Sequence, residues 1–256
     1  MGVQLRLDAA VALSIAVAIS VFYAVAQGTY LLILFANYGL ILFAGSAGLL
    51  GLVSYARLGR SKMGYVSLGF AVGVLMWMLG LVVYTYNYLI AGGEMPYNSL
   101  ADVFYLLSYP PMVLGCVGLL RTFASSLERT QWLSVAIAGV VLCISVVLYA
   151  VIPSIAELSD PLEVLTTSLY PLLDVLIVVL LLPLFVAFRK GIFGAPYFLL
   201  TLGTLLMVLG DLIFTYVNLM IGYYDGHPLD LFWFMSCISS GYGFWRQHTG
   251  FNLGEE

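Results

Sequence analysis

The sequence predicts an all-α membrane protein with eight transmembrane helices. Of its 256 residues, 62% are hydrophobic and only 9% are charged, a balance far outside that of soluble globular domains. A helix that spans a bilayer needs about 20 mostly apolar residues, because the hydrocarbon layer is about 30 Å thick. Eight such stretches occur along the chain, at 9–27, 31–56, 64–90, 100–122, 131–152, 167–188, 194–221 and 229–247.

The positively charged residues give these helices an orientation. Lys and Arg collect in short cytoplasmic loops, and all nine basic residues lie on one side of the predicted helices. The connections on the other side carry Glu94, Glu157, Asp160, Glu163 and Asp225 and no basic residue. We therefore expect a multi-pass protein of the cell membrane with both termini in the cytoplasm and no nucleic-acid partner. The basic residues are Arg6, Arg57, Arg60, Lys62, Arg121, Arg129, Arg189, Lys190 and Arg246.

Two stretches, 79–108 and 209–236, share a polar register across a helix, a loop and the start of the next helix. The sequence thus predicts two four-helix units, residues 1–130 and residues 131–256 with a short cytoplasmic tail. Because four is an even number, the copies would cross the membrane in the same direction, as parallel repeats. The alternative is a likeness that arises only because apolar helices share a composition. The aligned pairs include Gly80 with Gly210, Thr85 with Thr215, Tyr86 with Tyr216, Asp102 with Asp230, Ser108 with Ser236 and Tyr38 with Tyr170.

The first predicted helix has two interpretations. Arg6, an apolar run and the small residues Ala24 and Ala26 before Gln27 are typical of a cleaved signal peptide as well as of a retained helix. Its counterpart in the second half, residues 134–152, lies in the middle of the chain, where a signal peptide does not occur. We therefore expect the first helix to be retained.

Small residues in the helices favour close packing. Gly45, Gly48 and Gly51 recur at every third position of the second helix, and small side chains let two membrane helices approach each other. Three cysteines lie inside apolar helices at no metal-ligand spacing, and we expect them to pack as small apolar residues. They are Cys116, Cys143 and Cys237.

Four aspartates lie within or at the ends of the predicted helices. An ionised side chain in hydrocarbon costs about 2.5 to 3.5 kcal/mol on insertion scales, so it normally faces a bundle interior and marks a functional site. Asp174 and Asp211 lie roughly 10 and 15 Å below the outer ends of their helices. Asp102 and Asp230 begin helices, where an acid caps backbone N–H groups and suits the positive end of the helix dipole. For these two, a helix cap and a site residue are both open.

Aromatic and polar side chains gather at the depth of these aspartates. Residues at i+3 and i+7 share a helix face, which places Tyr105 and Tyr109 below Asp102. We predict an outward-opening ligand pocket in the outer half of the bundle. The alternative is an interfacial aromatic belt with hydrogen bonds between helices. The predicted ligand-binding residues are Tyr84, Asn87, Tyr88, Tyr105, Tyr109, Tyr170, Asp174, Asp211, Thr215 and Asn218.

The sequence lacks the patterns of several enzyme and cofactor classes. It has no helical His pair for a haem, no HExxH, no CxxC and no phosphate-binding glycine loop. The two lysines, Lys62 and Lys190, lie in predicted cytoplasmic loops, so a retinal-type Schiff base has no buried lysine. We therefore predict no metal, no cofactor and no enzymatic activity. An enzyme that uses carboxylates alone, such as a lipid-modifying one, stays open as an alternative.

Three segments together resemble a known membrane region. They are EMPYNSLADVFYLLSYP at 94–110, YPLLDVL at 170–176, and LGDLIFTYVN with DGHPLDLFW within 209–233. They resemble the multi-helix sensor region that precedes diguanylate cyclase, cyclic-di-GMP phosphodiesterase or histidine kinase domains in bacteria and archaea. In that family a Pro-x-x-Ser-Leu-Ala-Asp-x-Phe-Tyr segment enters a helix, and Tyr-Pro-x-x-Asp and Gly-Asp follow. The resemblance covers nearly all eight helices and implies membrane sensing.

The chain departs from that family at its C-terminal end. Only ten residues follow Arg246, so we expect a sensory, ligand-binding protein of the lipid bilayer without its own output domain. Its partner would be a separate signalling protein on the cytoplasmic face. A small-molecule or ion-coupled transporter is the first alternative, because parallel repeats and unpaired membrane carboxylates suit one. A membrane scaffold subunit, whose polar residues only hold helices together, is the second.

Overall fold

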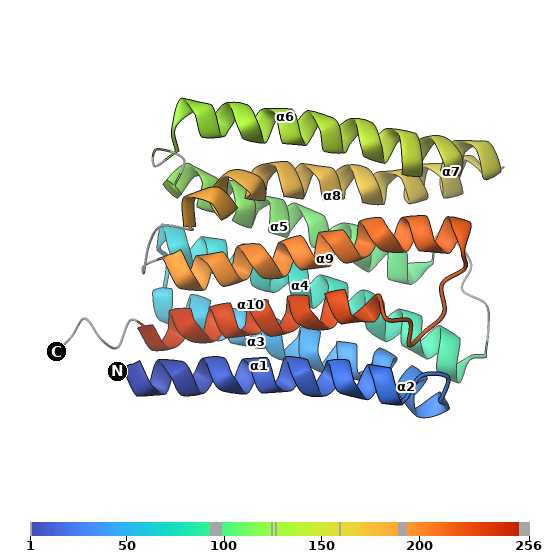
Figure 1. Ribbon diagram of the computed structural model, residues 1–256, viewed down its shortest axis with the longest axis horizontal. Coiled ribbons are helices and arrows are strands. Elements are labelled where there is room, and N and C mark those ends of the chain that lie inside the picture. Colours follow the sequence, from blue (N-terminus) through green and yellow to red (C-terminus); the bar gives the residue numbers. More distant parts are fainter. Residues whose placement is uncertain are drawn as a thin grey trace.

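The computed structural model describes residues 2–92, 99–123, 125, 127–158, 160–188 and 194–250. Within these residues the regular elements are all helical and no strand occurs, which confirms the predicted all-α class. The helices lie side by side as long rods, and the start of the first helix and the end of the last lie at the same end of the bundle (Figure 1). Three charged residues of the orientation argument, Glu94, Arg189 and Lys190, fall outside the described ranges.

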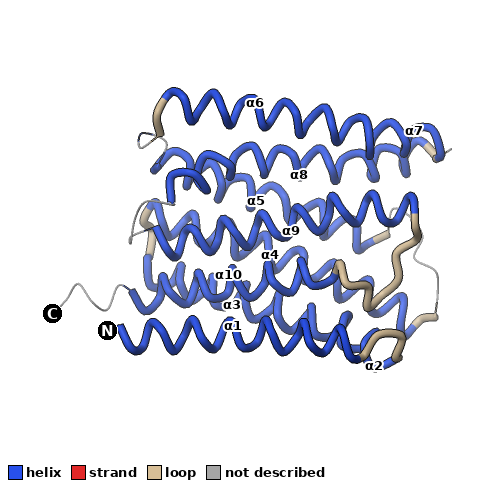
Figure 2. Tube along the Cα trace, in the orientation of Figure 1, coloured by secondary structure: helices blue, strands red, loops and turns tan. Residues whose placement is uncertain are grey.

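Eight rods follow one another along the described chain, as the tube of Figure 2 also shows. Three of them contain a five-residue π-helical segment. The elements are α1 Gly2–Val25, α2 Tyr30–Leu34, η1 Phe35–Gly39, α3 Leu40–Leu58, α4 Lys62–Thr85, η2 Tyr86–Ile90, α5 Leu100–Phe123, α6 Arg129–Val146, η4 Val147–Val151, α7 Ile152–Glu157, α8 Pro161–Phe188, α9 Ala195–Met220 and α10 Asp230–Gly250.

Seven of the eight described rods are long and apolar enough to cross a membrane. The eighth, α10, is 21 residues long and is more polar because its buried face carries hydroxyl and amide groups, those of Ser236, Ser240 and Gln247. The protein is therefore a multi-pass α-helical membrane protein. Most predicted ends agree with the observed ones to within a few residues, but α1 begins at Gly2 rather than at residue 9, and α8 begins at Pro161 rather than at residue 167.

Six helices form a closed ring. Contacts join α3 to α4, α4 to α5, α5 to α8, α8 to α9, α9 to α10, and α10 back to α3. The remaining rods lie outside the ring: α1 packs against α10, and α6 packs against α8. Figure 1 shows α1 and α6 at opposite edges of the molecule. Both outer helices therefore leave much of their surface for lipid, and large apolar side chains such as Leu13 and Leu133 are exposed on them.

The half of the ring near the chain ends is filled by side chains. Phe70, Leu119, Leu200 and Phe244 come from four different helices, and each is at most 1% exposed. In the same half, Gln247 on α10 accepts hydrogen bonds from Ser54 on α3 and Ser67 on α4. Hydroxyl-to-amide bonds of this kind hold membrane helices together. Within the described residues, the ring is thus a packed core at this end.

Aligned glycines lie at the close contacts of two helix pairs. A β-carbon on Gly80 of α4 would stand 2.4 Å from the ring of Tyr105 on α5, and one on Gly210 of α9 would stand 2.9 Å from the indole of Trp233 on α10. Deeper in the bundle, a β-carbon on Gly73 would stand 3.0 Å from the carbonyl oxygen of Ser108, and one on Gly203 would stand 2.9 Å from that of Ser236. Both pairs therefore need a residue without a side chain at the same two levels.

The cysteines do not all have the packing environment that the sequence suggests. Cys116 and Cys237 are buried inside the ring, as small apolar residues would be. Cys143 is exposed on the outer helix α6, because that helix packs against the ring along one face only.

Candidate functional site

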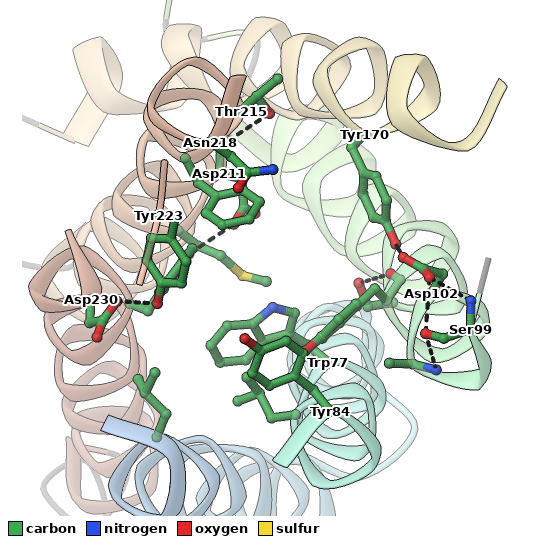
Figure 3. Close-up of a pocket in the computed structure, with 18 of the residues that line it drawn as sticks. Trp77, Tyr84, Ser99, Asp102, Tyr170, Asp211, Thr215, Asn218, Tyr223 and Asp230 are labelled. Carbon is green, nitrogen blue, oxygen red and sulfur yellow. Dashed lines mark hydrogen bonds between the residues drawn. The ribbon is translucent and has the colours of Figure 1, made fainter. Parts of the chain in front are cut away.

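The other half of the ring contains a cavity of about 460 Å³. It lies at the end away from the chain ends, since Ser99 before α5 and Tyr223 and Asp225 in the α9–α10 loop take part in its lining. Side chains from all six ring helices, or from the segments that continue them, surround the space (Figure 3). Cavities of roughly 300–1,000 Å³ are typical of small-molecule sites.

Most of the residues predicted for the pocket line this cavity, and three do not. Asn87 and Tyr88 lie in η2, and Tyr88 is 41% exposed. Asp174 is 1% exposed but lies beside the cavity wall, where the Tyr109 hydroxyl donates to its Oδ1 at 2.8 Å and its Oδ2 has no partner among the described residues. The predicted residues that line the cavity are Tyr84, Asp102, Tyr105, Tyr109, Tyr170, Asp211, Thr215, Asn218 and Asp230.

Asp102 is both a helix cap and a cavity residue. Its Oδ2 accepts from the backbone N–H and the hydroxyl of Ser99, while the Ser99 hydroxyl accepts from the N–H of Ala101. This reciprocal arrangement is a capping box, which satisfies N–H groups at the start of α5. The other oxygen, Oδ1, accepts from the Tyr170 hydroxyl of α8 at 2.7 Å. Asp102 therefore ties the start of α5 to α8 across the cavity wall.

Asp230 holds the α9–α10 loop instead of capping its own helix. It is fully buried, and its Oδ1 accepts from the Tyr223 hydroxyl at 2.6 Å. Its Oδ2 accepts from the Tyr23 hydroxyl of α1 and from the backbone N–H of Gly226. Gly226 has a φ of +86°, a conformation that favours glycine. The aligned residues Asp102 and Asp230 thus accept hydrogen bonds from similar donors, but Asp102 holds the start of α5 and Asp230 holds the α9–α10 loop.

Asp225 is a loop residue that points into the protein. It is 7% exposed, its Oδ1 accepts from the Tyr84 hydroxyl, and its Oδ2 accepts from the side-chain amide of Asn37 in η1. The Asn37 carbonyl oxygen in turn accepts from the hydroxyl of Thr85. Burial raises the pKa of Asp225 above the ordinary value of an aspartate, and the two hydrogen bonds oppose this rise. The network fastens the loop over the cavity to two helices of the ring.

Asp211 lies on the wall of the cavity in the middle of α9. Its Oδ1 accepts from the indole N–H of Trp233 at 2.8 Å. No described residue donates to its Oδ2, in contrast to Asp102, Asp225 and Asp230, whose oxygens all have donors. Asp211 is therefore the cavity aspartate that keeps one oxygen available.

Two other polar groups of the lining are available as well. Trp77 is 7% exposed, and its indole N–H has no hydrogen-bond partner within the described part of the chain. The same holds for the hydroxyl group of Tyr105. Both side chains line the cavity, and Figure 3 shows Trp77 between the Asp211 side and the Asp102 side of the space. The cavity thus offers an acceptor, a donor and a hydroxyl that can do either.

The described lining is acidic and contains no basic side chain. Among the residues that the structure describes there, four are aspartates and none is Lys, Arg or His. In the ranges that the structure describes, no group of three or more His, Cys, Asp or Glu side chains is arranged to hold a metal ion. The described part of the site is therefore acidic and aromatic.

Sequence reasoning missed four residues of this network. Asn37, Asp225 and Tyr223 line the cavity, and Tyr23 supports it through Asp230. Their partners lie far along the chain, up to 207 positions away, so no local spacing indicates them. One signal was present: an asparagine in an apolar helix is costly in lipid and usually finds a partner inside the bundle. In comparisons with known proteins, no family model, no curated protein and no solved structure matches the chain.

Proposed function

We propose that this protein is a non-enzymatic membrane sensor that binds a small molecule in the cavity of its six-helix ring. The observation that carries the proposal is the cavity itself, which is enclosed by elements from both halves of the chain and keeps Asp211, Trp77 and Tyr105 available for a ligand. A packed scaffold would fill such a space or pair its polar groups. The resemblance to membrane regions of signalling proteins also supports sensing.

The shape of the ring supports a sensor more than a channel. The half near the chain ends is filled by Phe70, Leu119 and Phe244, so a ligand that enters the cavity meets a closed floor. A sensor needs a ligand to alter the packing of its helices, and the cavity joins helices of both proposed halves. We propose that the response passes to a separate signalling partner on the cytoplasmic face.

A transporter is the second candidate, and one observation favours it. Short π-helical segments interrupt three of the rods, and one of them, η1, supplies Asn37 to the cavity. Irregular helical segments recur at functional sites and at the binding sites of transporters. A carrier would need the packed floor below the cavity to open.

The proposal includes the orientation and the duplication that the sequence predicts. The cavity would open to the outside of the cell, and the basic residues of the opposite end would lie in the cytoplasm. The two halves would be parallel repeats. In a superposition of the halves, α3, α4 and α5 would lie on α8, α9 and α10, respectively. The aligned positions of Gly80 and Gly210 at close helix contacts, and the ring order of the six helices, support this duplication.

A binding screen with a blocked cavity tests the proposed function. The purified protein in lipid nanodiscs is screened by thermal unfolding against small metabolites, and the screen is repeated on Thr215→Trp, which puts an indole into the cavity. The matched control is Thr249→Trp near the other end of the bundle, because both hydroxyls bond to the carbonyl four residues earlier in a helix.

The expected result is a set of compounds that raises the unfolding temperature of the wild type and of Thr249→Trp but not of Thr215→Trp. Stabilisation that survives in Thr215→Trp, or no stabilisation by any compound, would contradict a ligand site in the cavity. Reconstituted vesicles then separate the two candidate functions. Binding without uptake of the labelled ligand supports a sensor, and uptake supports a transporter.

A further inference from the structure

The chemistry of the cavity identifies the class of ligand that it suits. Among the described residues, its lining combines four aspartates with a majority of aromatic and apolar side chains and contains no cationic side chain. An anionic ligand would meet only like charges there. A neutral ligand would leave the carboxyl groups without a counter-charge at a depth where ions are costly. A positively charged ligand removes this cost.

The four aspartates would not contribute equally to the binding of such a ligand. Asp102, Asp225 and Asp230 accept hydrogen bonds at both oxygens, and these bonds hold helix starts and the loop in place. Asp211 uses only Oδ1, on the indole of Trp233, and keeps Oδ2 available. The available oxygen belongs to a side chain that is already oriented, because the bond from Trp233 fixes its rotamer.

A cluster of aromatic rings lies on the same wall, joined to Asp211 through Trp233. The Trp233 ring that bonds to Asp211 lies 5.9 Å from the ring of Phe214 and 6.2 Å from that of Tyr223, measured between ring centres. Phe214 and Tyr223 also contact each other edge to face at 4.9 Å. The faces of aromatic rings attract cations, and sites for organic ammonium ions use several rings around the charged nitrogen. A small metal ion prefers a shell of oxygen atoms, which this wall does not offer.

We propose that the cavity binds a small organic ammonium ion whose charged nitrogen lies beside Asp211, within the cluster of Phe214, Tyr223 and Trp233. This inference rests on the proposed ligand-binding function. The available donor of Trp77 adds a further requirement, since it is 7% exposed and needs an acceptor. The ligand therefore also carries an acceptor oxygen, as amino alcohols and their quaternary forms do.

Choline and its neutral isostere, 3,3-dimethylbutan-1-ol, test the role of the charge. They have nearly the same shape and the same hydroxyl group, and only choline is a cation. Both are titrated against the full chain in nanodiscs by calorimetry and by thermal unfolding, with potassium chloride at equal concentration as the ionic-strength control. We expect choline to bind at least about tenfold more tightly than the alcohol, and potassium chloride to leave the unfolding temperature unchanged.

Two variants locate the site. Asp211→Asn keeps the acceptor for Trp233 and removes the charge, and it should weaken choline binding by about tenfold or more. Asp8→Asn is the matched control, because Asp8 also accepts from an indole, that of Trp245, but lies outside the cavity. It should bind choline like the wild type.

Each outcome bears on the inference. Equal binding of choline and the alcohol, equal stabilisation by potassium chloride, or unchanged binding to Asp211→Asn would overturn the ammonium site. If no ammonium compound binds while a neutral compound stabilises the wild type and not Thr215→Trp, the ligand class is wrong and the binding function stands. If every compound stabilises Thr215→Trp as much as it stabilises the wild type, both proposals fail.

Discussion

The indole N–H of Trp233 on α10 donates to the carboxyl group of Asp211 on α9 at 2.8 Å, directly beside the backbone of Gly210. The indole nitrogen lies 2.9 Å from the point where a β-carbon on Gly210 would stand. The glycine that precedes the aspartate therefore makes room for the ring that orients it. Helix packing and site geometry are set by the same two neighbouring residues of α9.

Replacing this glycine should disturb the site and the fold together. Gly210→Ala would force the Trp233 ring away from α9, and overpacking of this kind costs about 1–3 kcal/mol. Chemical denaturation in mixed micelles measures the change. Gly45→Ala is the control, since a β-carbon there meets no atom closer than 3.9 Å, and its stability should equal or exceed that of the wild type. A stable Gly210→Ala would show that the indole has room to shift.

The contributions of Tyr170 and Asp102 to the stability of the protein should be coupled. Tyr170→Phe removes a donor from a partly buried carboxyl group, and a hydrogen bond to a charged group contributes roughly 1.5–3 kcal/mol. A double-mutant cycle with Asp102→Asn measures the coupling, because the cap on Ser99 survives in the asparagine variant. We expect the second substitution to cost less in the presence of the first. Additive losses would mean that the two side chains do not interact in the membrane.

Loop residue Asp225 should make stability depend on pH. Its pKa is raised by burial, so between the ordinary value of about 3.9 and the raised value the folded state keeps a proton that the unfolded state has lost. The contribution of this group to stability is therefore present at low pH and is lost as the pH rises through the raised pKa. The unfolding temperature of the wild type relative to Asp225→Asn should fall as the pH rises above about 4. Asp160→Asn in another loop gives the background, and a difference that stays constant with pH would contradict the expectation.

The aromatic wall should contribute to ammonium binding separately from the charge. Phe214→Leu keeps an apolar side chain and removes a ring, and a cation–π contact is worth about 0.5–2 kcal/mol. Choline affinity should therefore fall by roughly two- to thirtyfold, while the affinity for 3,3-dimethylbutan-1-ol should change little. Phe104→Leu, at a position that does not line the cavity, is the control. A parallel loss for both ligands would indicate a change of cavity shape.

The orientation can be read by labelling single cysteines in whole cells. In a variant without native cysteines, a cysteine at Tyr224 in the α9–α10 loop should react with an impermeant reagent. A cysteine at Ser125, between α5 and α6, should react only after the cells are opened. Both positions are exposed, so the reagent reaches either one if the side of the membrane allows it. The reverse pattern would place the cavity mouth and the proposed ligand on the cytoplasmic side.

The sequence predicts the helices well because they depend on local properties. Apolar length defines a membrane helix, and spacing along it places Asp211 and Thr215 on one face, about one turn apart. Asp174 shows the limit of this reasoning. Because α8 begins at Pro161, Asp174 lies thirteen residues, or roughly 20 Å, from the start of its helix instead of the expected 10 Å. Its side chain lies next to Tyr109 and outside the cavity lining. The position of a residue along a helix depends on where the helix ends, and the direction of its side chain depends on all the neighbouring helices.

The structure of the loop between α9 and α10 was the hardest part to predict from the sequence. Asp225 looks like a solvated loop acid, and its burial depends on Asn37 and Tyr84, which lie 188 and 141 positions away. Such a contact exists only once the ring has closed. A polar residue in an apolar helix, such as Asn37, indicates that a partner exists but does not identify it.

The closing contact of the ring has a consequence for the biogenesis of the protein. The ring is completed where α10 packs against α3, and α10 is the last of the described helices to leave the ribosome. Until then Asp211 lacks the Trp233 indole, and the side of the cavity that α10 later covers faces the bilayer. The nascent chain therefore carries the carboxyl group of Asp211 without its indole donor between the insertion of α9 and that of α10. An insertase or membrane chaperone has its clearest target at this stage, on the open edge between α3 and α9.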